Sequence, residues 1–109
     1  MTTPKTKPSS VAKIVRNILQ KCTMTAPVTI HPEGASVWET EDIADTSVEI
    51  GGRTAIIPGY DGQFQAVKIV NGEYKDLGFT SKKPEKVAKR AIGAYIELCL
   101  NSCQIDEGE

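Results

Sequence analysis

The stretch at residues 63–79, QFQAVKIVNGEYKDLGF, decides the fold, because two β-rich runs flank the dipeptide Asn71-Gly72. Asn-Gly between such runs is the strongest short-range signal for a β-hairpin with a two-residue turn. We therefore predict a hairpin here, with one face carrying two lysines beside two phenylalanines. A two-residue turn sets the register as Val70 opposite Glu73, Lys68 opposite Lys75, Ala66 opposite Leu77 and Phe64 opposite Phe79.

Further β-rich runs precede this hairpin. The segment TSVEIGGRTAII (46–57) predicts a second hairpin, which turns on Gly51-Gly52. The segments PVTIH (27–31) and ASVWET (35–40) predict two short strands around the turn PEG. The middle of the chain is therefore expected to form four to six antiparallel strands connected as a meander.

Both ends of the chain predict amphipathic helices. In SSVAKIVRNILQKC (9–22), apolar residues recur three and four positions apart, with Ser9 or Ser10 as N-cap. A second helix is expected from about Ser81 to Cys103, because Pro84 is tolerated only in a first turn. The predicted fold class is α+β, with the C-terminal helix packed on one face of the sheet.

Length and composition suit a single small domain. We expect a flexible lead-in over 1–8, one α+β domain over 9–103 and a frayed acidic tail over 104–109. No apolar run is long enough for a membrane span, and the N-terminus lacks the apolar core of a signal peptide, so we expect a cytoplasmic protein. Three cysteines without a CxxC spacing predict reduced, mostly buried thiols, with no zinc site and no cofactor.

Charge is unevenly distributed, although the net charge is only −1. Residues 1–21 carry five cations and no acid, and residues 81–100 have a net charge of +3. Between them, residues 22–50 carry six acids and no Lys or Arg. Two basic segments therefore flank an acidic one.

The most basic stretch is GFTSKKPEKVAKR (78–90), where five cations meet one acid, Glu85, at the predicted start of the second helix. A helix N-terminus carries partial positive charge, so cations there are unfavourable unless an anion such as phosphate binds. The alternative interpretation of these lysines, and of those on the hairpin, is a solvated face. The candidate nucleic-acid-binding residues are Lys68, Lys75, Lys82, Lys83 and Lys86, with Lys13, Arg16 and Lys21 added if the first helix packs nearby.

The stretch FQAVKIVNGEYKDLGFTSKKPEKVAKRAIGAY (64–95) resembles the arm-type DNA-binding domain of phage-type tyrosine integrases, a three-stranded sheet plus a helix. It resembles the DNA-binding domain of plant ethylene-response factors in the same way. The resemblance implies a sheet that lies in the DNA major groove, with that role falling on Lys68 and Lys75. The residues that fit the pattern are Leu77, Gly78, Phe79, Thr80, Lys82, Lys83, Glu85, Ala88 and Ala91.

The helix–sheet–helix order also resembles the double-stranded-RNA-binding domain, as does a KKxxK cluster at the start of the last helix. This resemblance implies that Lys82, Lys83 and Lys86 contact phosphate across a groove. The chain departs from that family at Lys89 and Arg90, where two alanines are usual, and in the additional strands of 28–57.

Motifs of catalysis are missing from the sequence: there is no glycine-rich phosphate loop, HExxH or GxSxG. His31 is more typical of a turn than of a lone base. We therefore predict a small non-enzymatic nucleic-acid-binding protein. The alternative is a protein-binding inhibitor or adaptor of the kind found in phages and mobile elements. It would act through the acidic segment 33–49, either by docking onto a basic protein surface or as a nucleic-acid mimic. Its candidate residues are Trp38, Glu39, Glu41, Asp42 and Asp45.

Overall fold

The computed structural model describes residues 7–31, 46–59 and 62–107. For residues 101–107 it describes the backbone alone. Over the described residues the chain forms two helices and one five-stranded antiparallel sheet with the strand order β1-β2-β3-β4-β5. The predicted α+β class and the antiparallel meander are confirmed. The elements are α1 (Pro8–Lys21), β1 (Val28–His31), β2 (Ser47–Ile50), β3 (Thr54–Pro58), β4 (Phe64–Val70), β5 (Glu73–Ser81) and α2 (Pro84–Glu107).

Both predicted hairpin turns form, because their residues adopt positive φ. Between β4 and β5, Asn71 has φ +52° and Gly72 has φ +79°. Between β2 and β3, Gly51 has φ +59° and Gly52 has φ +69°. Two successive residues of this kind twist the turn in the same sense as the strands, which favours a tight hairpin.

The predicted register of the β4–β5 hairpin is right near the turn and wrong beyond it. Val70 pairs with Glu73 and Lys68 with Lys75, as predicted. The predicted pairs Ala66–Leu77 and Phe64–Phe79 do not form, because the register shifts between Ala66 and Val67. The observed partners are Phe79 for Ala66 and Ser81 for Phe64.

The register shift is caused by a bulge in β5 at Leu77 and Gly78. Gly78 has φ +74°, and its backbone N–H donates a hydrogen bond of 2.7 Å to Oδ1 of Asp76. A hydrogen bond from the side chain of Gln65 and the one from Gly78 lower the pKa of Asp76. The charged carboxylate is therefore the form that holds the bulge.

The N-cap of helix α1 lies two or three residues earlier than predicted. Pro8 occupies the first turn and Lys7 is the N-cap, without a side-chain hydrogen bond to cap the helix. The Lys7 carbonyl accepts hydrogen bonds from the N–H groups of Ser10 and Val11. The prediction of Ser9 or Ser10 as N-cap is therefore wrong, since the fixed φ of proline already suits the first helical position.

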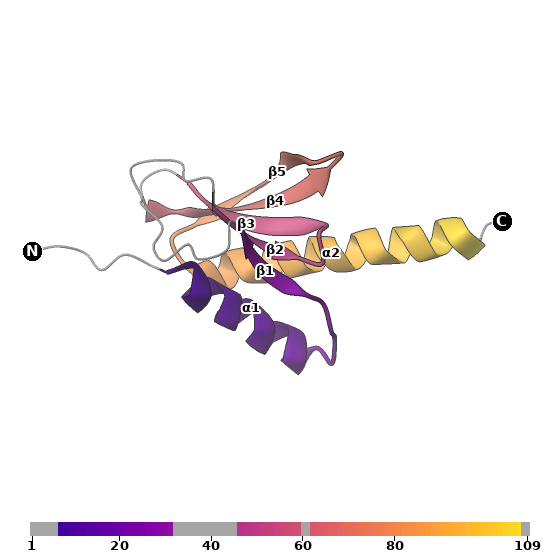
Figure 1. The fold of residues 1–109 in the computed structure, drawn as a ribbon, viewed down its shortest axis with the longest axis horizontal. Helices are drawn as coiled ribbons and strands as arrows, with labels where there is room; N and C mark the ends of the chain where they lie inside the picture. The colour runs from indigo at the N-terminus through magenta and orange to yellow at the C-terminus, as the bar shows by residue number, and fades with distance from the viewer. Residues whose placement is uncertain (1–6, 32–45, 60–61, 108–109) are drawn as a thin grey trace, which may run out of the picture.

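Both helices pack on the same face of the sheet, α1 beside β1 and α2 across β2 to β5 (Figure 1). The helices also contact each other, and the distal part of α2 continues past the end of the sheet. The apolar faces of both helices and of the central strands meet in one core. Its buried members include Val11, Val15, Leu19, Val48, Ile50, Ile56, Phe64, Ala66, Val87, Ala91 and Ile92.

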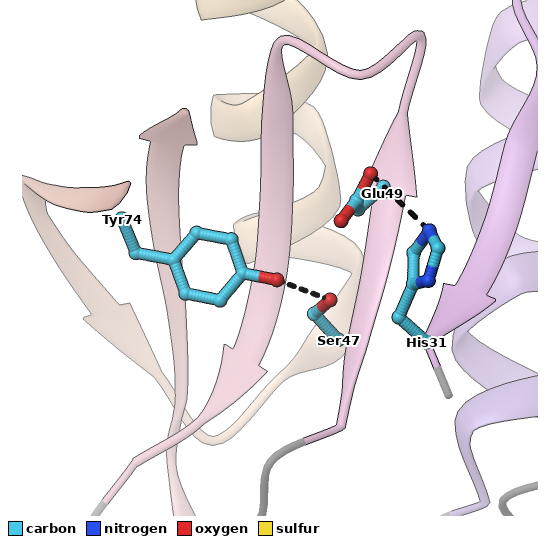
Figure 2. Close-up of polar contacts among 4 residues, drawn as sticks. All are labelled: His31, Ser47, Glu49 and Tyr74. Atoms are coloured by element: carbon cyan, nitrogen blue, oxygen red, sulfur yellow. Dashed lines mark hydrogen bonds and ion pairs between the residues drawn. The ribbon is translucent and has the colours of Figure 1, made fainter. Parts of the chain in front are cut away.

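The sheet is strongly curved toward the face that the helices leave uncovered. The hydroxyl of Tyr74 on β5 lies 2.6 Å from Oγ of Ser47 on β2 (Figure 2). In a flat sheet the three spacings between β2 and β5 would amount to about 14 Å, which is further than a tyrosine side chain reaches. Ala55 and Val67 are buried on this curved face.

Thr54 carries a buried hydroxyl on the helix-covered face of β3. The residue is fully buried, and its Oγ1 has no hydrogen-bond partner among the described residues. Because an unpaired buried hydroxyl is destabilising, we expect Thr54→Val to raise the free energy of unfolding by about 1–2 kcal/mol. Urea unfolding should show a higher midpoint with an unchanged slope.

The matched control for this variant is Thr80→Val, which changes an exposed threonine on β5 in the same way. Its effect should stay within about 0.5 kcal/mol. A lower stability of Thr54→Val would mean that the Thr54 hydroxyl is paired in solution.

Candidate nucleic-acid interface

The three lysines predicted at the start of α2 lie together. The carbonyl of Lys83 accepts hydrogen bonds from the N–H groups of Lys86 and Val87, so α2 begins directly after Lys83 rather than at about Ser81. The Ser81 hydroxyl accepts the N–H of Lys83 at 3.1 Å and fixes the chain where it enters the helix. Lys82, Lys83 and Lys86 are exposed, and we call them the lysine cluster.

The rest of α2 extends further than the sequence predicted. The placement of Pro84 in the first turn is confirmed. The helix continues to Glu107, four residues beyond the predicted end at Cys103. The segment expected to be a frayed tail therefore includes helical residues.

Both helices open on a Lys-Pro dipeptide, Lys7-Pro8 in α1 and Lys83-Pro84 in α2. In each, the lysine carbonyl accepts the first helical hydrogen bonds, and the lysine has no side-chain oxygen to accept the free N–H groups of the first turn. A cation therefore stands at the positive end of both helix dipoles. This arrangement favours an anion nearby, as predicted for α2 and not foreseen for α1.

A groove of about 570 Å³ runs between the two helices and brings lysines from both together. The sequence left open whether cations of α1 join the α2 lysines. Lys21 does, because it lines this groove. Arg16 does not line it and instead donates a hydrogen bond of 3.2 Å from Nη2 to the carbonyl of Val28. The groove has apolar walls and a cationic rim. Its lining residues are Ile14, Asn17, Ile18, Lys21, Cys22, Lys83, Glu85, Lys86 and Lys89.

Asn17 and Lys89 were not among the candidate binding residues, although Lys89 is one of the five cations of residues 78–90. Lys89 lies three residues after Lys86, so helical spacing alone could have placed it beside the lysine cluster. Asn17 could not be found in this way, because its role depends on which side of α1 faces α2.

The hairpin lysines are separate from the lysine cluster. Lys68 and Lys75 pair across β4 and β5 near the turn, whereas α2 starts at the opposite end of β5. Nζ of Lys75 lies 3.5 Å from Oε1 of Glu73. The phenylalanines expected to stack on a ligand beside these lysines are not available for it, because Phe64 is buried and Phe79 packs against the core.

The residues of the alternative site, Trp38, Glu39, Glu41, Asp42 and Asp45, lie outside the described residues. The predicted strand over 35–40 lies there too. The role of the acidic segment as a protein-binding site therefore stays a prediction.

On the curved face, His31 is the last residue of strand β1. The prediction that it lines a turn is therefore wrong. Nε2 of His31 lies 3.4 Å from Oε1 of Glu49 on β2, beside the Ser47–Tyr74 hydrogen bond (Figure 2). In the described part of the chain, no three His, Cys, Asp or Glu side chains are grouped so that they could hold a metal ion.

The expectation of mostly buried cysteines is wrong for Cys22, which is exposed at the end of α1. Its position as C-cap, just past the last apolar turn, places the thiol outside the core. Cys99 is half-buried, and its hydrogen bond with Tyr95, together with burial, raises the pKa of Tyr95.

Over the residues that the structure describes, neither helix is long and apolar enough to cross a membrane. Comparison with protein-family models, with curated proteins and with solved structures finds no match to this chain.

Proposed function

We propose that this protein binds nucleic acid through its phosphate backbone, with the lysine cluster as the main contact. The observation that supports this best is the charge of the helical layer. Residues 7–22 carry four cations and residues 82–90 carry five, against a single acid, Glu85. A polyanion laid along α1 and the first turns of α2 would therefore meet cations almost alone.

The lysines of the cluster are free to take such a contact. None of their ammonium groups pairs with a carboxylate of the described residues. The groove between the helices adds Lys21 from α1 to the same surface. One exposed lysine–phosphate contact is weak, but several together give binding that depends strongly on salt.

The test is fluorescence anisotropy with labelled duplex DNA, duplex RNA and single strands of mixed sequence, at 50 and 200 mM salt. Three phosphate contacts on a duplex predict an affinity about 40-fold lower at the higher salt. The double variant Lys82→Glu/Lys83→Glu should lower the affinity by at least about tenfold, since two attractive contacts become repulsive.

The matched control is Lys68→Glu/Lys75→Glu, which changes the net charge by the same amount at the other end of the hairpin. We expect it to keep the affinity within about threefold of the wild type at 200 mM salt. Equal losses in the two double variants would reject the lysine cluster as the site. The absence of binding to all three nucleic acids at 50 mM salt would reject the function.

A further inference from the structure

The outward face of α2 combines features that the core does not explain. Lys89, Gly93, Glu97 and Leu100 recur three and four residues apart, so they lie on one side of the helix. Leu100 is 56% exposed, more than any other large apolar side chain among the described residues. The distal part of α2 continues past the end of the sheet (Figure 1). An exposed leucine on a projecting helix suits a contact with another molecule.

Gly93 stands in the middle of this face. Glycine inside a helix costs about 1 kcal/mol relative to alanine. A Cβ at Gly93 would meet nothing within 4 Å, so packing within the chain does not require glycine there. Close approach of another backbone is a condition that would require it.

We propose that two copies of this chain pair through α2 in antiparallel orientation, with the two-fold axis at Gly93. Positions equally far from Gly93 on either side then face each other. Lys89 of each copy lies opposite the partner's Glu97, so two equivalent ion pairs form. Such an interface is isologous, because the same face serves both copies.

Charge decides the orientation. In a parallel pair, Lys89 would face the partner's Lys89, and Glu97 would face the partner's Glu97, so both contacts would repel. In the antiparallel pair the basic first half of α2 meets the acid of the second half. Leu100 then lies opposite the partner's Lys86, whose stem lines the groove together with Ile14 and Ile18. The exposed leucine thereby gains apolar walls.

Lys82 and Lys83 precede the paired segment and stay outside it, whereas Lys86 belongs both to the lysine cluster and to the pairing face. The contact covers only about three to four helical turns, which places it at the weak end of specific interfaces. Dimerisation should therefore depend on concentration between about 5 µM and about 1 mM.

Sedimentation equilibrium over that range tests the pairing without any nucleic acid. The wild type should approach twice the monomer mass. Lys89→Glu and Glu97→Lys should each raise the dimer dissociation constant at least about tenfold, since each turns two attractions into repulsions. An equal mixture of these two variants should recover heterodimers with a dissociation constant within about threefold of the wild type, because every lysine then faces a glutamate.

Two further variants complete the design. Leu100→Gln should weaken the dimer by removing the apolar contact, without touching a charge. Lys13→Glu makes the same charge change as Lys89→Glu on an exposed position of α1 and should leave the dimer unchanged. A wild type that stays monomeric at 1 mM would overturn the pairing. A mixture of the two charge variants that fails to associate would overturn the antiparallel register.

Discussion

Replacing Ile56 by alanine is expected to lower the free energy of unfolding by about 2–5 kcal/mol. Ile56 is fully buried in the third of five strands, on the face that both helices cover. Its neighbours in the sheet, Val48 and Ala66, are fully buried too, so surrounding side chains have little freedom to fill the space. Because domains of this size are stable by about 5–15 kcal/mol, the loss would be a large share of the total.

Urea unfolding followed by circular dichroism measures this loss. The control is Ile57→Ala, which removes the same atoms from the next residue of β3. Ile57 is only half-buried and lies on the opposite face of the sheet, so its loss should be less than about half as large. A larger loss for Ile57→Ala would mean that the curved face, and not the helix-covered face, holds the main core.

The positions of the two hairpins could be predicted from the sequence because they depend on local chemistry. Asn71-Gly72 and Gly51-Gly52 adopt positive φ with little strain, wherever the strands are placed. The bulge in β5 could not be predicted in this way. It places the large Phe79 opposite the small Ala66 instead of opposite Phe64, and this advantage exists only once the helices cover that face.

The candidate site also has one part that follows from the local sequence and another that depends on how the helices pack. Lys82, Lys83 and Lys86 lie within five consecutive residues, so their proximity follows from the sequence alone. The contribution of Lys21 depends on how α1 packs against α2, which no local pattern gives. The sequence could not show whether Lys68 and Lys75 lie on the helix-covered face or on the opposite face of the sheet. Apolar residues occur on both faces of β4, and only the packed structure shows which face the helices cover.

Replacing Gly51 by valine is expected to lower the free energy of unfolding by about 3–5 kcal/mol. Part of this cost is local, since φ of +59° is strained for a β-branched residue. The rest comes from α2, because a Cβ at Gly51 would overlap with Cε1 of Tyr95. The ring would have to leave its place beside the core and its hydrogen bond with Cys99.

Gly52→Val separates the two contributions. Gly52 has a similar φ of +69°, but a Cβ there would meet nothing within 4 Å, so only the backbone strain of about 1–3 kcal/mol remains. The comparison should then be repeated in a Tyr95→Ala background, where the ring is missing. If contact with Tyr95 causes the difference, Gly51→Val and Gly52→Val should cost the same there, to within about 0.5 kcal/mol. A difference that persists without the ring would place its cause in the hairpin itself and not in the docking of α2 on the β2–β3 turn.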